Sequence, residues 1–414
     1  MESFLNCMKD IYLYFQIHQP YRINSVKKAS AWQDFFVGEE YGKNSLDMRN
    51  ETIFEKVALS CYLPTTEFWL GQLVKFPQLK FSISFSGTFL EQCLQYPKYG
   101  IKILELFNKL IATNRVEILD ETYYHSLAFL VDLQEYLEQI KLHRNLIKKL
   151  FNYAPVSFRN TELIYNNYVG AVVKNLGYET ILIEDAWWNR ESKISPNSSI
   201  YLSQDYSLKT EEKDLLTNYQ VGVIKNNFKL ILRNEEATDG VIFNADENRL
   251  LAAIENSESG EIGIFTDYEF LGEHSTEREK IFGLLENQIL KIIENKHTFK
   301  LIKEARINQV IVYNCPEYSS WGHKERDITV WRGGQAQEQA FLKLQESFKI
   351  IQTQKPELIE AWRRLSTSCH FYFLGQKTGP DKEFVDLFSP YNSAEEALEK
   401  YLRVSDELLR LVNK

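Results

Sequence analysis

The sequence lacks the features expected of a membrane protein or of a disulfide-rich secreted protein. It has no run of about 18 apolar residues, and residues 1–10 show no basic segment followed by an apolar one. We therefore expect neither a membrane span nor a secretory signal. The five cysteines are widely scattered and form no C-x-x-C pair, which argues against a disulfide framework or a thiolate zinc site. These absences favour a cytoplasmic protein with reduced thiols.

Acidic residues outnumber basic residues in this chain. It contains 48 Lys and Arg and 57 Asp and Glu, which gives a net charge of -9. Proteins that bind nucleic acids draw most of their affinity from clustered cations, so this balance argues against a nucleic acid partner and favours a neutral ligand. Aromatic residues make up 14% of the chain. Their rings stack on the apolar faces of sugars and bases, although an aromatic-rich core explains the same composition.

Strand-like and helix-like segments alternate through most of the chain, a pattern typical of parallel α/β proteins with long connections. The segments with strand character are 11–17, 79–85, 116–119, 156–158, 180–183, 228–232, 241–243, 261–265 and 309–313. From about residue 315 helical patterns dominate, and Ser393-x-x-Glu396 forms a capping box before the last of them. We predict a barrel domain over 1–314, with an irregular insertion around 191–244, and a helical domain over 315–414 that contributes a loop to the cleft.

The most informative stretch is 261–274, where a short apolar strand runs into Asp267, Glu269, Glu273 and His274. Thr276-x-x-Glu279 then reads as a capping box, which puts this polar cluster on a strand-to-helix loop. In barrel-type α/β folds such loops lie on the active face.

Other predicted strands also end in polar side chains. These ends carry His18, Glu91, residues 120–125, residues 159–162 and residues 267–274. Any one of them could simply cap a helix, but several strand ends on one face are where barrel enzymes keep their catalytic residues.

Two carboxyl groups in these clusters have opposite surroundings. Glu162 follows Arg159, and a nearby cation favours the charged form that a nucleophile needs. Asp267 lies among Glu269 and Glu273, whose like charges favour its protonated form. Two carboxyls held in opposite protonation states are the acid/base pair of a glycosidase, with about 5–5.5 Å between them if configuration is retained.

A zinc site is the alternative interpretation of the histidines. His18, His125, His274, His323 and His370 could bind zinc together with acids, but no H-E-x-x-H or similar spacing occurs. Because histidines and carboxylates also hydrogen-bond sugar hydroxyls, we expect no metal and no other cofactor.

The sequence contexts of the tryptophans predict two groups, one at the binding site and one in the core. Trp187, Trp188 and Trp321 lie in polar contexts and are candidates for stacking on a sugar, whereas Trp69 and Trp362 lie inside helical patterns and are expected in the core.

Four motifs, in this order and spacing, resemble those of glycoside hydrolase family 57, in particular its α-amylase-like members. They are His18-Gln19-Pro20, residues 87–92, Phe158-Arg159-Asn160-Thr161-Glu162-Leu163-Ile164-Tyr165 and Asp267-Tyr268-Glu269-Phe270-Leu271-Gly272-Glu273-His274. Ser320-Trp321 to Arg326-Asp327, with Trp331, is similar to a family segment that reaches from the helical region to the cleft. One departure is Cys369, where close relatives are expected to carry an aspartate.

This resemblance implies an incomplete (β/α)7 TIM-like barrel followed by a helical bundle, and retaining cleavage of α-1,4-glucans without a metal or nucleotide. Glu162 would be the nucleophile and Asp267 the acid/base. His18, Glu91, Glu269 and His274 would hold the sugar, and we also expect substrate contacts from Arg159, Trp187, Trp321 and Asp327. Two alternatives stay open at this point: a 4-α-glucanotransferase that uses the same two carboxylates, and a catalytically silent glucan-binding protein.

Overall fold

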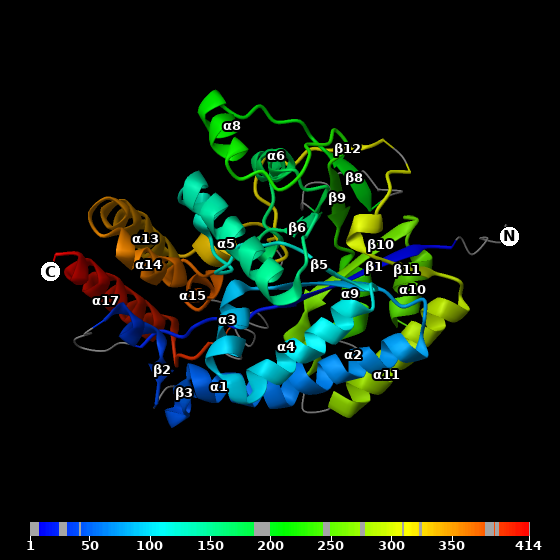
Figure 1. Ribbon diagram of the computed structural model, residues 1–414, viewed down its shortest axis with the longest axis horizontal. Coiled ribbons are helices and arrows are strands. Elements are labelled where there is room, and N and C mark those ends of the chain that lie inside the picture. Colours follow the sequence, from blue (N-terminus) through cyan, green and yellow to red (C-terminus); the bar gives the residue numbers. More distant parts are fainter. Residues whose placement is uncertain are drawn as a thin grey trace.

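The computed structural model describes residues 8–24, 31–40, 43–185, 199–242, 249–273, 278–308, 310–322, 325–376, 385 and 389–413. Parallel strands lie at the centre of the molecule, with helices around them (Figure 1). Among the described residues, parallel pairing joins one set of strands in the order β10-β1-β4-β5 and a second set in the order β6-β7-β9. Their bounds are β1 (Asp10–Ile17), β4 (Phe81–Phe85), β5 (Val116–Ile118), β6 (Ser157–Arg159), β7 (Thr180–Ile183), β9 (Lys229–Leu232) and β10 (Glu261–Asp267).

Two isolated parallel bridges join these sets into a ring. Asp120 pairs with Phe158 just beyond β5, and Arg233, just beyond β9, pairs with Gly263 in β10. The ring therefore runs β1, β4, β5, β6, β7, β9, β10 and back to β1 within the described residues, in chain order and all parallel. The predicted incomplete (β/α)7 barrel is confirmed.

β1 is enclosed by other strands on both of its sides. β10 pairs along one side of it, and β4 and β11 (Thr298–Lys300) share the other side. Every residue from Ile11 to Ile17 is buried. This explains the near-continuous apolar sequence, since a parallel strand covered on both faces has no solvent side that would require alternation.

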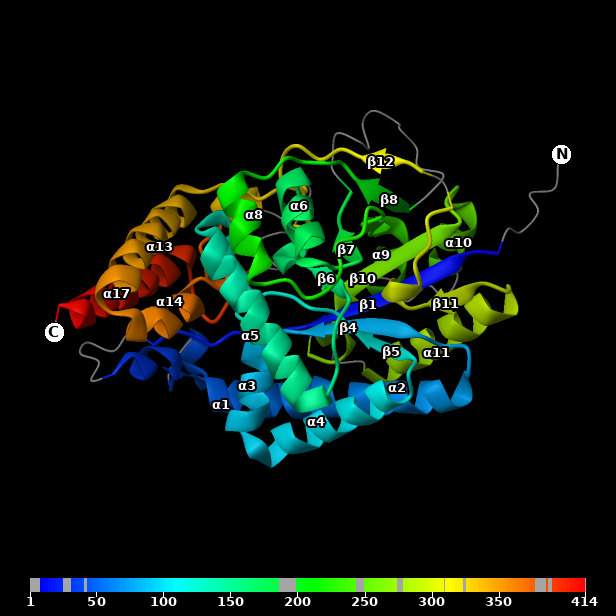
Figure 2. The same ribbon diagram turned by 45° about the horizontal axis from the view of Figure 1, so that its top comes forward.

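Helices connect the strands and cover the outside of the barrel. Figure 2 shows α2 and α4 running beneath β4 and β5. The bounds of these helices are α1 (Asn50–Val57), α2 (Leu63–Lys75), α3 (Gly87–Gln95), α4 (Pro97–Ala112), α5 (Leu133–Phe151), α6 (Asn167–Leu176), α9 (Glu235–Ile242), α10 (Arg249–Asn256) and α11 (Arg278–Glu294). Trp69 of α2 is fully buried, as its place in a helical pattern predicted.

The strand predicted at 241–243 is wrong. Val241 and Ile242 end helix α9, and Phe243 lies outside the described residues. The helix begins after Asn234, whose Oδ1 accepts a hydrogen bond from the backbone N of Ala237 at 2.9 Å. The cap at Asn234 thus outweighs the local β propensity of Val241 and Ile242. The rest of this region holds β8 (Ile200–Ser203), antiparallel to β9, and α8 (Thr210–Thr217).

The C-terminal helices gather at one end of the molecule, at the left of Figure 1. They are α12 (Thr329–Arg332), α13 (Gln335–Gln354), α14 (Ile359–Leu365), α15 (Ser368–Tyr372) and α17 (Ala394–Val412). Half of the predicted capping box before α17 is confirmed, since Ser393 Oγ accepts from the backbone N of Glu396 at 3.2 Å, whereas Glu396 Oε2 accepts from the backbone N of Asn392 at 2.9 Å. Trp362 is fully buried among these helices, and their core continues into Phe35, Phe36 and Leu127 from the barrel loops. A domain boundary at 314/315 stays a prediction.

The short edge strand β12 (Val312–Tyr313) pairs with β8. None of the helices in the described ranges is both long enough and apolar enough to cross a bilayer.

Candidate active site

Polar side chains from the carboxyl ends of several barrel strands meet at one place. The His18 ring, after β1, stacks on the His125 ring, after β5, with 4.2 Å between the ring centroids. His125 Nε2 lies 3.3 Å from Oε1 of Glu162, after β6. The convergence expected for a barrel active site is therefore present.

Glu162 receives hydrogen bonds from three separate segments. Ser368 Oγ donates to Oε1 at 2.7 Å, Trp321 Nε1 donates to Oε2 at 2.7 Å, and His125 Nε2 lies 3.3 Å from Oε1. The side chain is 15% exposed. Glu162 and Leu163 both have positive φ, at 57° and 53°, in the short 3₁₀ turn that follows β6. Non-glycine residues adopt this conformation at a cost, and such strain often accompanies functional sites.

The surroundings of Glu162 keep its carboxylate charged. Burial alone would raise its pKa, but the hydrogen bond from His125 and the positive charges of His125 and Arg159 outweigh burial and lower the pKa to about 2. Hydrogen bonds to the charged form and nearby cations both stabilise a carboxylate. Glu162 is therefore ionised across the physiological pH range.

Arg159 supplies one of these cations from inside the barrel. Its guanidinium is fully buried and lies 4.9 Å from the ring centre of Trp321, a cation–π distance. Its Nε and Nη2 have no hydrogen-bond partner within the described part of the chain. A buried guanidinium with two unpartnered nitrogens, which carry three N–H groups, can donate to a bound hydroxyl or to water.

Asp267, the last residue of β10, has the opposite electrostatic surroundings. Burial, followed by the negative charge of Glu162, raises its pKa to about 6. The two carboxyl groups are thus electrostatically coupled, and the site favours one ionised and one protonated member below about pH 6.

Glu269 and His18 lie beside this pair. Glu269 Oε1 accepts hydrogen bonds from the backbone N of His18 and from Tyr62 Oη, both at 3.1 Å. Burial and the charges of Asp267 and Glu273 raise the pKa of Glu269 well above its usual value. Burial and the nearby cations of His125 and Arg159 lower the pKa of His18 well below its usual value. Both shifts favour the neutral form of the side chain.

His125 and Ser368 are part of the site, although the sequence suggested His125 only as a possible zinc ligand and did not suggest Ser368. Burial lowers the pKa of His125, but its hydrogen bonds with Glu121 and Glu162 have the larger combined effect and raise it. The sequence signal for His125 as a site residue was its place in one of the polar strand ends, residues 120–125. Ser368 lies 206 residues from Glu162, and no local pattern links the two.

Two predicted substrate-binding residues make other contacts. Glu91, in α3, pairs through Oε1 with Arg364, whose guanidinium lies 4.0 Å from the ring centre of Tyr21. Asp327 Oδ1 accepts from the backbone N of Thr329 at 2.8 Å and from its Oγ1 at 2.6 Å, which orders the start of α12. The structure thus brings His18, Arg159, Glu269 and Trp321 to the two carboxyls, but gives Glu91 and Asp327 other partners.

Trp187 and His274 lie outside the described residues, as do Trp188 and His323. Among the residues that are described, no group of three or more His, Cys, Asp or Glu side chains is arranged to hold a metal ion.

Comparison with known proteins gives one family match. A model described as glycosyl hydrolase family 57 matches residues 12–314. A curated protein of Methanocaldococcus jannaschii, provisionally named an alpha-amylase, is 31% identical over 410 residues, which cover 94% of this chain and 82% of that protein.

The solved structures that resemble the fold include a branching enzyme and a glucanotransferase. A GH57-type branching enzyme from Pyrococcus horikoshii superposes with a TM-score of 0.64 at 13% identity, covering 98% of this chain and 94% of that one. A 4-alpha-glucanotransferase from Thermococcus litoralis superposes with a TM-score of 0.57 at 16% identity, covering 89% of this chain. The chain spans about half, 52%, of that transferase. At these identities the likeness concerns the fold.

Proposed function

The chain belongs to glycosyl hydrolase family 57, and on this premise we propose that it is a retaining glycoside hydrolase of the α-amylase type, which cleaves α-1,4-glucosidic bonds in starch, glycogen or maltodextrins. Membership in the family makes the protein an enzyme of the glycosidase or transferase kind. The specific reaction, the substrate and the roles of individual residues are the proposal.

The observation that carries the proposal is that the surroundings of Glu162 lower its pKa whereas those of Asp267 raise its pKa. Glu162, with a pKa of about 2, attacks the anomeric carbon as a carboxylate, and a covalent glycosyl-enzyme forms. Asp267, with a pKa of about 6, donates its proton to the leaving glycosidic oxygen and then takes a proton from the incoming water. We predict about 5–5.5 Å between the two carboxyl groups when a sugar is bound.

The groups around the pair support binding of a neutral sugar. His18 and Glu269 are buried or partly buried, and the pKa shift of each favours its neutral form, so they exchange hydrogen bonds with hydroxyl groups without adding charge. Arg159 offers two nitrogens, Nε and Nη2, that have no hydrogen-bond partner among the described residues, and Trp321 offers an aromatic face. We propose that these four side chains hold the glucosyl unit at the cleavage point.

Transfer to a sugar hydroxyl competes with hydrolysis, because both reactions resolve the same intermediate. We keep 4-α-glucanotransferase as the second candidate. It uses Glu162 and Asp267 in the same roles and differs only in the acceptor.

The experiment compares the wild-type protein and Glu162→Ala on maltoheptaose, following product lengths and total reducing ends together. Shorter products with rising reducing ends support the hydrolase, and longer products at constant reducing ends support the transferase. Glu286→Ala is a matched control, since this glutamate on α11 pairs with Lys75 at the surface. A silent glucan-binding protein would bind the sugar without turning it over, and full activity of Glu162→Ala would remove the nucleophile assignment.

The cysteines support a reducing compartment. Cys61, Cys93, Cys315 and Cys369 are free thiols in the described part of the chain, and we propose a cytoplasmic location on this basis.

A further inference from the structure

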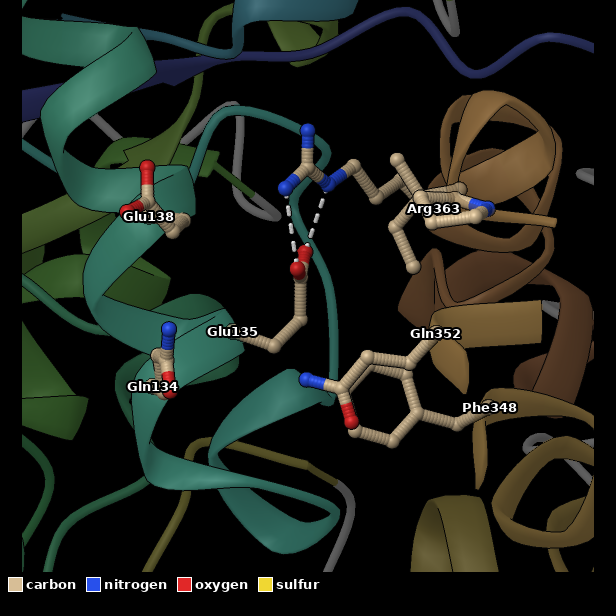
Figure 3. A pocket seen from close by; sticks show the side chains of 8 residues that line it. Gln134, Glu135, Glu138, Phe348, Gln352 and Arg363 are labelled. Atoms are coloured by element: carbon tan, nitrogen blue, oxygen red, sulfur yellow. Dashed lines mark hydrogen bonds and ion pairs between the residues drawn. The ribbon is translucent and has the colours of Figure 1, made fainter. Parts of the chain in front are cut away.

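A bidentate ion pair connects the C-terminal helices to the barrel. Arg363, on α14, donates from Nε to Oε1 of Glu135 at 2.7 Å and from Nη2 to Oε2 at 2.9 Å. Figure 3 shows the guanidinium reaching across to Glu135 on α5, beside Gln352 and Phe348 of α13. The pair borders a cavity of about 160 Å³ between these helices. Glu135 is only 5% exposed, so its charge depends on Arg363 for compensation.

A continuous series of buried hydrogen bonds leads from this ion pair toward Glu162. Glu135 Oε1 also accepts from Gln139 Nε2 at 2.9 Å, and Gln139 Oε1 accepts from Ser126 Oγ at 2.6 Å. The backbone N of Ser126 donates to Thr122 Oγ1 at 3.1 Å, which lies 2.8 Å from Oγ1 of Thr161. Thr161 is the residue before Glu162. Each polar group along this path is satisfied by the next, which favours a single arrangement.

At Ser126 the same path passes through a place where a barrel segment pairs with a C-terminal segment. Ser126 and Thr367 form an isolated antiparallel bridge. The backbone N of Leu127 donates to Ser366 O, and the backbone N of Ser368 donates to His125 O, each at 3.0 Å. His125 and Ser368, the two side chains on Oε1 of Glu162, therefore come from opposite sides of one backbone pairing.

We propose that the Arg363–Glu135 ion pair is a clamp that positions the nucleophile, by holding residues 124–128 of the barrel against residues 366–368 so that His125 and Ser368 both reach Oε1 of Glu162. Arg363 and Glu135 touch neither substrate nor reacting atoms and are positioning residues. The enzyme thus becomes competent only when the C-terminal helices are docked. The role of Glu162 in this inference rests on the proposed function, whereas the pairing of the two segments does not.

Four variants test the clamp. Arg363→Ala removes it, Arg363→Lys keeps the cation but loses the planar fork, and Glu135→Gln keeps the shape of the side chain without its charge. Arg403→Ala is the control, because Arg403 also belongs to the C-terminal helices but pairs with Glu399 of its own helix at the surface. Should Arg363→Ala fail to fold, Arg363→Lys and Glu135→Gln carry the test.

The first measurement is kcat and KM on maltoheptaose. Misplacing a reacting group by about 1 Å can cost about 100-fold in rate, so we expect kcat of Arg363→Ala to fall by about 10-fold to 100-fold. KM should change by less than about twofold, since the groups proposed to bind the sugar are not part of the path. Arg363→Lys should recover part of the loss, and Arg403→Ala should match the wild type.

The second measurement is hydrogen exchange at the backbone N–H groups of Leu127 and Ser368. Both should exchange at least about tenfold faster in Arg363→Ala than in the wild type, because the clamp holds their pairing closed. Wild-type kcat together with wild-type exchange at both amides would overturn the proposal. An inactive wild type whose two amides nevertheless respond to Arg363→Ala would refute the proposed function and leave the clamp standing.

Discussion

Trp321→Phe tests how the site keeps Glu162 ionised. The substitution removes the indole N–H that donates to Oε2 at 2.7 Å, and it keeps an aromatic face for Arg159, whose guanidinium lies 4.9 Å from the ring centre. Burial acts to raise the pKa of Glu162, and the Trp321 hydrogen bond is one of the contacts that act against it. Its removal should therefore raise that pKa.

The size of the shift follows from the strength of a hydrogen bond to a charged group, about 1.5–3 kcal/mol. One pKa unit corresponds to about 1.36 kcal/mol, so we expect a rise of about 1–2 units. The pKa of Glu162 starts at about 2 and should reach about 3–4. The nucleophile is active only as a carboxylate, so the fall of kcat/KM on the acid side should move to higher pH by the same amount.

The assay is kcat/KM on maltoheptaose from acid to neutral pH, with circular dichroism at each pH to verify that the protein stays folded. Trp331→Phe is the matched control. It removes the same atoms from a buried tryptophan whose Nε1 has no hydrogen-bond partner among the described residues. Only Trp321→Phe should shift the acid limb. An acid limb identical to that of the wild type, with both variants folded, would refute the assigned role of Trp321.

Three further predictions concern the pH dependence of activity, the stability of the barrel and the effect of a chelator. In the wild type, kcat/KM should fall as pH rises through about 6, because the active form of Asp267 carries the proton; a profile flat to pH 8 would contradict this. Asp120→Asn should lower the free energy of unfolding in urea by about 3–5 kcal/mol, since buried Asp120 pairs with His143 and Arg144, both at 2.8 Å; a loss below about 1 kcal/mol would exclude this. Activity should survive treatment with EDTA, and a loss that zinc restores would favour the zinc-site alternative.

Much of the barrel could be predicted because its strands are local patterns. β1 and β10 are short apolar runs followed by polar residues, and each needs only neighbouring residues to be recognised. The same local rule failed at Val241 and Ile242, where the cap at Asn234, several residues earlier, decides for a helix. The β-branched residues alone could not show that a helix cap earlier in the chain would outweigh their preference for a strand.

The site also contains residues that local patterns reveal and contacts that they do not. His18, Glu162 and Asp267 could be found because each follows a strand, and barrel geometry brings strand ends together. The hydrogen bonds from Ser368 and Trp321 to Glu162 join residues 206 and 159 positions apart. These contacts arise from the docking of the C-terminal helices, which the periodicity of those helices does not specify. The left-handed backbone at Glu162 likewise has no signature in residue type.

The most direct test of Glu162 as the nucleophile is to trap the covalent intermediate. A fluorinated α-glucosyl fluoride slows hydrolysis of a glycosyl-enzyme, so that the adduct can be located by mass spectrometry of peptides. We expect one sugar residue attached to Glu162, no adduct in Glu162→Ala, and an α-anomer as the first product from maltoheptaose. A β-anomer as the first product, or an adduct on another residue, would contradict the assignment of Glu162 as the nucleophile of a retaining enzyme.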